Sequence, residues 1–424
     1  MQLIATTAFG LEKLVFRELE ALGYEPRVLR PGRVAFAGDT AAICRANLWL
    51  RTAERLVICL GTFRADDFGQ LFDGTNSLPW EEWIPPVGAF PVSGRSHKSQ
   101  LTSVPACQRI VNKAIAERLL TAHQVTELRE TEGTYAVEIE LFENQASLLL
   151  DTSGAGLHKR GYRKLIAEGQ LRETLAAAMV TLSVWNRDRP FIDPFCGTGT
   201  IAIEAALIGR NQAPGLDREF AAEAWPTVGG TAWHVAREEA RDLWKPPLEQ
   251  KIVATDIDPK ILDLARYHAQ RARVADDIHF QERAFGDLTS SRLHGCMICN
   301  PPYGLRVGSE AETKQLYREI PIVLRRLPTC SHYLLTADKD FEKTVGQKAT
   351  RRRKLYNARI ECTYYQFLGP KPVSTMTGHA KPQAAALRGL AETAPVFGGL
   401  RKESERQARE FSNRLTNRAR HLRR

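Results

Sequence analysis

Three short groups of residues in the second half of this 424-residue chain have types and spacing that could do chemistry. The first is Asp193-Pro-Phe-Cys-Gly-Thr-Gly-Thr200. Its glycines, Gly197 and Gly199, remove side chains from a turn between a strand and a helix, so the backbone can approach a cofactor closely. No Gly-Lys-Ser/Thr follows, which excludes a Walker phosphate loop, whereas the relaxed dinucleotide pattern G-x-G-x-x-A is satisfied. The turn predicts a cofactor site, with a tight turn of packing glycines as the alternative.

The second group is acidic and follows the next predicted strands. Asp256 ends a short apolar strand, where a carboxylate can accept hydrogen bonds from two ribose hydroxyls. In a dinucleotide-binding fold this acid lies about 20 residues after the glycines, but here it lies 57 residues after Gly199. We therefore expect a helical insertion at residues 211–250. Asp258 is expected to cap a helix, and Asp287 follows the third strand, where an adenine amino group would lie.

The third group, Asn300-Pro301-Pro302-Tyr303, directly follows the apolar segment Cys296-Met-Ile-Cys299, a predicted buried strand. Two prolines fix the backbone and remove two N–H donors, so their carbonyl groups have no competing donor beside them. The amide oxygen of Asn300 and the carbonyl of Pro301 then form a pair of acceptors, and Tyr303 adds an aromatic face. Such a pair suits the two N–H groups of a nucleobase exocyclic amine. A proline-rich turn without this role is the alternative.

The elements that must position these residues alternate between strand and helix from about residue 165 onward. The predicted strands are residues 191–193, 251–256, 296–300 and 333–336, and the predicted helices are residues 201–208 and 259–273. This alternation predicts a parallel sheet covered by helices on both faces, with ligands beyond the carboxyl ends of the strands. The first 155 residues instead predict mixed α and β structure, with helices at residues 11–22 and 105–120 and a half-buried strand at residues 135–141.

Composition and charge narrow the class of protein. No apolar stretch reaches the ~18 residues of a membrane helix, and the first residues have neither a basic start nor a long apolar block. We therefore expect a cytoplasmic protein with no membrane partner. Eight scattered cysteines predict reduced thiols, and no cluster has zinc-ligand spacing, so we expect no metal. The net charge is +10, and residues 380–424 hold 11 basic and 4 acidic side chains, which favours a polyanionic partner.

In this order the three groups resemble the motifs of class I S-adenosylmethionine (SAM)-dependent amino-methyltransferases. Four further segments make the chain similar to bacterial THUMP-domain RNA guanine-N2 methyltransferases: Arg95-Ser-His-Lys-Ser-Gln-Leu-Thr-Ser-Val-Pro105, Gly156-Leu-His-Lys-Arg-Gly-Tyr-Arg163, Ala213-Pro-Gly-Leu-Asp-Arg218 and Arg353-Lys-Leu-Tyr-Asn357. The resemblance implies an α/β fold, in which a Rossmann-like class I methyltransferase domain is preceded by an α+β ferredoxin-like segment and a THUMP domain. It also implies SAM as the cofactor. In the nearest branch the substrate is a guanosine of large-subunit ribosomal RNA, free or in a ribosomal precursor.

On this basis we expect five segments, and the likeness covers roughly residues 1–370. They are a ferredoxin-like segment (1–43), a THUMP RNA-binding domain (44–155), a connecting linker and helix (156–190), the methyltransferase domain (191–370) and a linker with a basic helical tail (371–424). The tail segment Glu410-Phe-Ser-Asn-Arg-Leu415 resembles the opening of a second methyltransferase that some members carry fused.

The resemblance also implies roles for individual residues. The cofactor is expected to contact nine residues: Asp193, Phe195, Gly197, Gly199, Thr200, Asp256, Ile257, Asp287 and Asn300. Methyl transfer is expected at Asn300, Pro301, Pro302 and Tyr303, where two acceptors hold the guanine N2 hydrogens and Tyr303 stacks on the base. RNA capture is expected from six basic residues of the first half: Arg95, His97, Lys98, Lys159, Arg160 and Arg163.

Four other functions stay open on the sequence. A transfer-RNA guanosine-N2 methyltransferase and a DNA adenine-N6 methyltransferase would use the same acceptor pair, although the THUMP-like first half argues for RNA. The glycine pattern alone permits a nicotinamide oxidoreductase, in which Asn300 has no role and for which no hydride-polarising His or Lys is evident. A non-catalytic RNA-binding assembly factor would keep the basic first half without needing Asn300.

Overall fold

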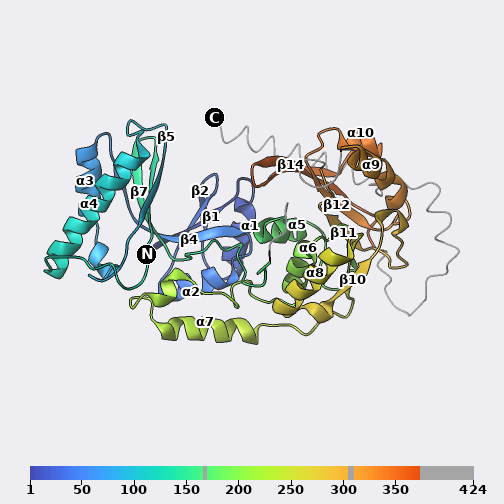
Figure 1. Ribbon diagram of the computed structural model, residues 1–424, viewed down its shortest axis with the longest axis horizontal. Coiled ribbons are helices and arrows are strands. Elements are labelled where there is room, and N and C mark those ends of the chain that lie inside the picture. Colours follow the sequence, from blue (N-terminus) through green and yellow to red (C-terminus); the bar gives the residue numbers. More distant parts are fainter. Residues whose placement is uncertain (166–169, 304–309, 373–424) are drawn as a thin grey trace. The chain divides into compact units, whose positions relative to one another are not determined.

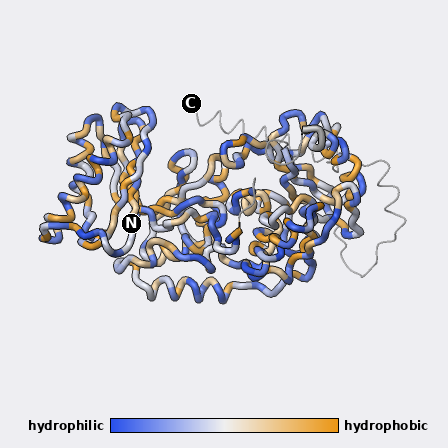
Figure 2. The backbone as a smooth tube through the Cα atoms, in the orientation of Figure 1, coloured by the Kyte–Doolittle hydropathy of each residue, from blue (hydrophilic) through white to orange (hydrophobic). Residues whose placement is uncertain are grey.

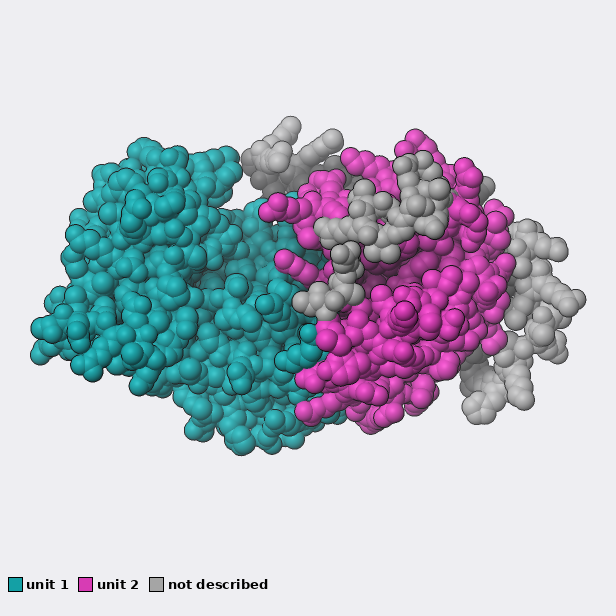
Figure 3. Space-filling model, viewed as in Figure 1, with its two compact units in different colours: residues 1–164, 173–178, 211–245 teal, residues 165–172, 179–210, 246–424 magenta. Residues whose placement is uncertain are grey.

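The computed structural model describes residues 1–165, 170–303 and 310–372, and Figure 1 shows their course. The expected tail beyond residue 372, with its predicted helix, lies outside the described residues. The chain divides into two compact units, which Figure 3 colours separately. Unit 1 contains residues 1–164, 173–178 and 211–245, and unit 2 contains residues 165–172, 179–210 and 246–424.

Unit 1 is built on one seven-stranded sheet with the strand order β2-β3-β1-β4-β7-β6-β5. Neighbouring strands are antiparallel except β5 and β6, which are parallel. The strands are β1 (Gln2–Thr7), β2 (Arg27–Arg30), β3 (Arg33–Ala37), β4 (Ala53–Arg64), β5 (Val92–His97), β6 (Val137–Phe142) and β7 (Gln145–Asp151). The helices are α1 (Glu12–Ala21), α2 (Thr40–Trp49), α3 (Phe68–Asn76), η1 (Trp80–Glu82), α4 (Val104–His123), η2 (Ala221–Ala224) and α7 (Gly230–Asp242). Helix α5 (Glu173–Thr181) is divided between the two units.

The long strand β4 places the first two predicted domains on one sheet. Residues 53–59 of this strand pair with β1, and residues 57–64 pair with β7. The first pairing joins the predicted ferredoxin-like segment to the predicted THUMP domain, and the second lies within the predicted THUMP domain. The boundary expected between them, after residue 43, falls inside α2.

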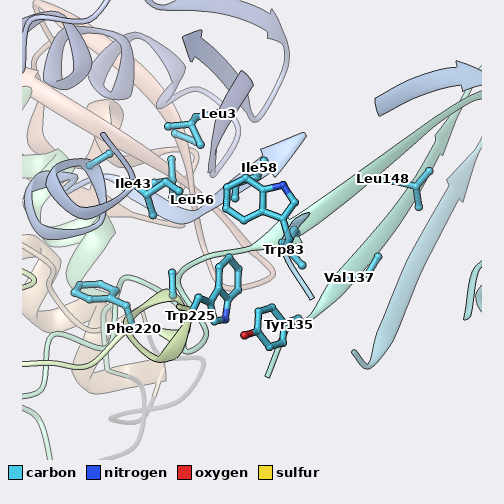
Figure 4. Close-up of a cluster of buried hydrophobic side chains, with 14 of the residues drawn as sticks. Leu3, Ile43, Leu56, Ile58, Trp83, Tyr135, Val137, Leu148, Phe220 and Trp225 are labelled. Carbon is cyan, nitrogen blue, oxygen red and sulfur yellow. The ribbon is translucent and has the colours of Figure 1, made fainter. Parts of the chain in front are cut away.

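The core of unit 1 forms where one face of the sheet meets the helices (Figure 4). In β6, Val137, Ile139 and Leu141 belong to this core, because every second side chain of a strand points to the same face. Helix α7 contributes Trp233 and Ala236 to this core, whereas most of its other residues are hydrophilic (Figure 2). The helix is therefore amphipathic and packs with its apolar side.

The expected insertion after the glycine turn is helical, but its residues 211–245 cluster with unit 1. The Trp225 ring stacks on Tyr135 with 5.0 Å between centroids (Figure 4), and its indole N–H donates to a backbone carbonyl at 3.1 Å. Arg45 of α2 makes two hydrogen bonds of 2.9 Å to the carboxylate of Glu239 in α7. The insertion thus completes the core of the N-terminal unit, although its sequence lies within the predicted methyltransferase domain.

Arg218 joins the insertion to the segment that follows β7. It is 9% exposed, and its guanidinium donates to the backbone carbonyls of Ser153, Ala155, Gly156 and Lys159. The guanidinium also lies over an aromatic ring of the insertion, 4.7 Å from the centroid. Two segments that carry the family resemblance, ending at Arg163 and Arg218, are therefore joined by one buried contact, and its role is structural.

We expect Arg218→Lys to destabilise the protein by about 2–3 kcal/mol, because an ammonium group cannot replace the forked guanidinium and leaves buried carbonyls unpaired. Urea unfolding followed by tryptophan fluorescence would measure the change, since Trp225 and Trp233 lie in the same core. Arg241→Lys is the matched control, because this α7 side chain is 50% exposed. The control should change stability by less than about 0.5 kcal/mol. Equal unfolding midpoints for the two variants would contradict the structural role.

Unit 2 is built on a second seven-stranded sheet, in the order β10-β9-β8-β11-β12-β14-β13. The strands from β10 to β12 are parallel, and β14 and β13 extend the sheet by antiparallel pairing. The strands are β8 (Phe191–Asp193), β9 (Ile252–Asp256), β10 (Ile278–Glu282), β11 (Cys296–Cys299), β12 (Ser331–Thr336), β13 (Arg351–Asn357) and β14 (Ile360–Phe367). The helices are α6 (Thr200–Gly209), α8 (Pro259–Arg271), η3 (Ala275–Asp277), η4 (Phe285–Asp287), α9 (Glu310–Leu324) and α10 (Phe341–Val345).

The strand order of unit 2 reverses between β8 and β11, because β9 and β10 lie on one side of β8 while β11 and β12 lie on the other. In open parallel sheets, ligands bind beyond the carboxyl ends of the strands at such a switch point. Asp193 and Asp256 end β8 and β9, and Asn300 follows β11. These three strands are adjacent, so three of the predicted site residues lie at one edge of the sheet.

The cysteines do not form disulfides in this structure. All eight are free thiols in this structure, and seven are buried. The prediction that Cys296 and Cys299 belong to a buried strand is confirmed by β11. Among the described residues, no helix is long and apolar enough to cross a membrane, and no group of three or more His, Cys, Asp or Glu side chains could hold a metal ion.

Candidate active site

The glycine turn between β8 and α6 has an open side and a packed side. Gly197 and Gly199 both adopt left-handed backbone conformations, with φ of +50° and +82°, which glycine reaches without steric cost. A Cβ at Gly197 would meet nothing within 4 Å, whereas a Cβ at Gly199 would lie 3.2 Å from Ala265 and 3.3 Å from Phe280. Gly197 therefore leaves space beside the backbone, as a bound ligand requires, while Gly199 lets α6 pack on its neighbours.

Asp256 holds the glycine turn from the neighbouring strand. Its Oδ2 accepts a hydrogen bond from the N–H of Gly197 at 2.9 Å, and its Oδ1 accepts one from the N–H of Asp258 at 3.1 Å. Each oxygen keeps a second lone pair, so this carboxylate can also accept hydrogen bonds from ligand hydroxyls. Asp258 caps α8 as predicted, accepting from the N–H of Lys260 at 2.9 Å. Ile257 is 71% exposed, so its side chain is accessible to a ligand.

Asp193 at the end of β8 is fully buried. Its Oδ1 accepts a hydrogen bond from the N–H of Phe195 at 3.3 Å, whereas its Oδ2 has no partner among the described residues. Burial raises the pKa of this carboxyl group well above its ordinary value, and the charge of Asp256 adds to the rise. A buried carboxylate oxygen without a donor is costly unless a ligand supplies one. The strand end therefore suits a cofactor that brings positive charge or N–H groups.

Phe195, Thr200 and Asp287 complete the expected cofactor residues. The Phe195 ring stacks on Phe285 of η4 with 4.7 Å between centroids. Asp287, which ends η4, is exposed, and Thr200 is buried at the first position of α6. These residues lie on the segments that follow β8 and β10. Sequence reasoning missed Phe285 as an aromatic neighbour, although it stands only two residues before Asp287.

The Asn300–Tyr303 segment follows β11 at the same edge of the sheet. Asn300 is half-buried and Pro301 is buried. The Tyr303 hydroxyl donates to Oδ1 of Asn300, and it also interacts with the side chains of Asn357 and Cys362 in the β13–β14 hairpin. Burial raises the pKa of Tyr303 above its ordinary value, so the hydroxyl stays protonated at neutral pH. The Asn300–Tyr303 segment, the tip that follows β11, is therefore linked to β13 and β14 at one end of the sheet.

This arrangement differs from the predicted one in the part that Tyr303 plays. The sequence predicts a ring that stands free for stacking, but the ring is half-buried and its hydroxyl holds the amide oxygen of Asn300. That hydrogen bond fixes the orientation of the amide. A ligand amine that binds to this oxygen has to share it with the hydroxyl or displace the hydroxyl. Asn357 and Cys362 were missed because they come from strands more than 50 residues later in the chain.

Three of the six residues expected to capture RNA lie in or just after β5, the edge strand of the unit 1 sheet. Arg95 forms ion pairs with two glutamates of β6, and half of its side chain stays exposed. The exposed His97 ring stacks on Phe142 with 5.7 Å between centroids. Lys98 is exposed and lies 3.7 Å from Glu143 in the turn between β6 and β7. All three are accessible, but carboxylates balance the charges of Arg95 and Lys98.

The other three residues lie after β7 and differ in exposure. Lys159 is exposed, whereas Arg160 is 3% exposed and donates to two backbone carbonyls, one of them at 2.7 Å. The side chain of Arg163 is 14% exposed and pairs with Glu173 at 3.3 Å. Arg160 holds the backbone together and is not available to a phosphate group, which corrects the expectation for that residue.

Three protein-family models match the chain. Residues 2–57 match the RlmL ferredoxin-like domain, residues 65–151 match the THUMP domain, and residues 160–366 match the RMKL-like methyltransferase domain. The strands of the first two matched regions form the sheet of unit 1, and the strands of the third matched region form the sheet of unit 2. The fold class predicted from the sequence, with ferredoxin-like, THUMP and class I methyltransferase parts, is confirmed.

Similar proteins span most of the chain. It is 46% identical to "Putative RNA methyltransferase YpsC" of Bacillus subtilis, over 86% of this chain and 95% of that protein. It is 30% identical to the ribosomal RNA large subunit methyltransferase K/L of Syntrophotalea carbinolica over 97% of this chain, and it spans 59% of that longer protein. The crystal structure of SMU.472, described as "a putative methyltransferase complexed with SAH", matches with 38% identity and a TM-score of 0.83, over 88% of this chain and 98% of that one.

The matches cover both units rather than the methyltransferase region alone. The order of the matched domains along the chain is also the order that the sequence motifs imply. The chain therefore belongs to the RMKL-like methyltransferase family, with the RlmL-type ferredoxin-like domain and the THUMP domain ahead of its methyltransferase domain.

Proposed function

We propose that this protein is a cytoplasmic SAM-dependent RNA methyltransferase that methylates the exocyclic N2 of a guanosine in large-subunit ribosomal RNA. The observation that carries the proposal is the place of the Asn300–Pro301 acceptor pair in the sheet. The pair follows β11, next to the strand that ends at Asp193 and one strand further from Asp256. The acceptors for an amine and the residues suited to the cofactor thus share one edge, at the switch point of the sheet.

The residues at the strand ends suit SAM, which supplies an electrophilic methyl group on a sulfonium. The free lone pairs of Asp256 accept hydrogen bonds from the ribose hydroxyls, and the open side of Gly197 lets the ligand approach the backbone. The unpartnered Oδ2 of Asp193 suits the cationic part of the ligand. Ile257 offers exposed apolar surface to the adenine ring.

The Asn300 amide oxygen and the Pro301 carbonyl accept the two hydrogens of the target amine. These hydrogen bonds favour a pyramidal nitrogen whose lone pair leaves conjugation with the ring and points at the methyl group. Such positioning can supply several kcal/mol of the barrier. Because burial raises the pKa of Tyr303, its hydroxyl remains a donor and does not act as a base. The amine proton leaves to water after the transfer, so the reaction needs no general base.

RNA is favoured as the substrate by the THUMP match at residues 65–151. It is also favoured by the names of two relatives, one an RNA methyltransferase and the other a ribosomal RNA large subunit methyltransferase. Guanine N2 is favoured by the resemblance of the motifs to guanine-N2 enzymes. Accessible basic groups of unit 1, including Arg95, Lys98 and Lys159, are the candidates for capturing the RNA backbone.

The proposal is tested by incubating the protein with methyl-labelled SAM and unmodified RNA, then digesting the RNA to nucleosides for mass spectrometry. With transcribed large-subunit ribosomal RNA we expect N2-methylguanosine as the labelled nucleoside. Label in transfer RNA alone would show that the substrate is transfer RNA. Labelled N6-methyladenosine would show that the acceptor is adenine N6 and would overturn the assignment of guanine N2. Binding of RNA without methyl transfer would indicate a non-catalytic RNA-binding protein.

We expect the affinity for SAM to increase as the pH rises toward the raised pKa of Asp193. Burial keeps this carboxyl group protonated above its ordinary pKa in the free protein, whereas a cationic ligand favours the ionised form, so binding releases a proton. A higher pH removes the cost of that release. Calorimetry over a pH series, in buffers of different ionisation enthalpy, would measure affinity and proton release together. Asp193→Asn should bind more weakly and without pH dependence, and a flat wild-type profile would contradict the assignment.

A further inference from the structure

The edge strand of the unit 2 sheet, β13, begins with four basic residues, Arg351-Arg-Arg-Lys354, and all four are exposed. The reaction proposed above does not use them. Because successive side chains of a strand point to opposite faces, Arg351 and Arg353 lie on one face while Arg352 and Lys354 lie on the other. The same strand therefore presents two pairs of cations that can be compared.

The two faces differ in how their charge is balanced. On one face, Arg352 and Lys354 pair with glutamates of α10 and β14, at 3.4 Å and 2.6 Å. On the other face, neither Arg351 nor Arg353 has a carboxylate partner within the part of the chain that the structure describes. The second face thus carries two uncompensated positive charges.

The uncompensated face leads to the candidate active site. Leu355 and Asn357 continue this face but are both buried, and Asn357 at its end interacts with the Tyr303 hydroxyl. Since β13 is antiparallel to β14 and β14 is antiparallel to β12, the last residues of β13 lie at the edge where the parallel strands end. At a rise of about 3.3 Å per residue, Arg353 lies about 13 Å and Arg351 about 20 Å along the strand from Asn357.

We propose that Arg351 and Arg353 bind phosphate groups of the RNA strand that flanks the target nucleotide, on its path to the Asn300–Tyr303 tip. This inference rests on the proposed function, because it assigns a path for the substrate of the same site. Guanidinium groups bind phosphate through two parallel hydrogen bonds and stay charged at every physiological pH. Enzymes that modify a base take it out of its stack, so the backbone beside the extruded nucleotide has to be held near the site.

Charged side chains on an edge strand also keep a sheet from pairing with another chain. That protection does not depend on whether each charge has a carboxylate partner, because either face of the strand can supply it. The difference between the two faces, and the position of Asn357 at the end of the unpaired face, are what favour a ligand over simple protection of the edge.

The test compares two double variants of the full chain. R351Q/R353Q removes the unpaired cations, and R352Q/K354Q removes the paired cations, so both variants lose two positive charges from the same strand. Binding is measured by fluorescence anisotropy with a short labelled single-stranded RNA that contains one guanosine, over a series of salt concentrations. KM and kcat are measured with transcribed large-subunit ribosomal RNA. Unchanged affinity for S-adenosylhomocysteine and an unchanged melting temperature confirm that each variant is folded.

For R351Q/R353Q we expect the salt dependence, log Kobs against log salt, to flatten by about 1.4, or about 0.7 for each lost phosphate contact on a single strand. KM for RNA should rise while kcat at saturating RNA is unchanged. R352Q/K354Q should keep the wild-type slope. The inference is overturned if both variants shift equally, which would mean an effect of net charge, or if R351Q/R353Q matches the wild type. Failure of the proposed function would differ, because the wild type itself would then transfer no methyl group to RNA.

Discussion

Asn300→Ala is expected to lower kcat for methyl transfer about 10²–10³-fold, the effect of removing one preorganised hydrogen-bonding group from a reaction centre. The reason is that the amide oxygen is one of two acceptors that hold the target amine, and Pro301 alone cannot fix the nitrogen in line with the methyl group. Single-turnover assays with labelled SAM would measure the loss. Calorimetry with S-adenosylhomocysteine should show a much smaller loss of affinity than of kcat, because Asn300 is only one of nine expected cofactor contacts and the turn and Asp256 are untouched.

Tyr303→Phe is the matched control for this variant. It removes the hydroxyl that donates to Asn300 Oδ1 and keeps the ring. Since the substrate amine replaces the hydroxyl as the partner of that oxygen and then holds the amide in place, we expect the control to keep most of its kcat. Normal turnover in Asn300→Ala would contradict the role of the amide. Equal losses in both variants would mean that the hydroxyl, rather than the amide, is the group that matters.

Asp256→Ala is expected to weaken S-adenosylhomocysteine binding about 100-fold, which is roughly 3 kcal/mol. The variant loses the acceptor for the ribose hydroxyls and the hydrogen bond that holds Gly197 in its left-handed conformation. Both losses act on the ground-state complex, so calorimetry measures them without any turnover.

Asp258→Ala is the matched control for Asp256→Ala. Its carboxylate caps α8 through the N–H of Lys260, and loss of such a cap costs about 1 kcal/mol of stability. We expect a lower melting temperature with unchanged ligand affinity. If Asp256→Ala bound the ligand as tightly as this control, the carboxylate at the end of β9 would have no part in cofactor binding.

The placement of several candidate site residues could be predicted because the carboxyl ends of parallel strands meet at one edge of a sheet. A residue that ends or directly follows an apolar strand is then placed without any knowledge of its neighbours, as for Asp193, Asp256 and Asn300. Local chemistry was also sufficient for the cap at Asp258, whose helix begins at Pro259. These inferences need only the spacing of apolar residues along the chain and the order of the predicted strands and helices.

Contacts between distant segments could not be predicted in the same way. A basic residue near a turn has the same appearance in sequence whether its guanidinium is buried, as in Arg160, or exposed. The membership of residues 211–245 in unit 1 depends on aromatic packing of Trp225 against Tyr135, which lies about 90 residues earlier in the chain, just before β6. Likewise, only the positions of the glutamates on α10 and β14 separate the paired Lys354 from the unpaired Arg353.

The most direct test of the central claim uses RNA in which the guanosines are replaced by inosine, which lacks only the exocyclic amine. If the Asn300–Pro301 pair binds that amine, the enzyme should methylate the guanosine RNA and transfer nothing to the inosine RNA, while the inosine RNA still competes for binding through its phosphates. Transfer of label to the inosine RNA at a comparable rate would contradict the account, because the acceptor would then be a different atom.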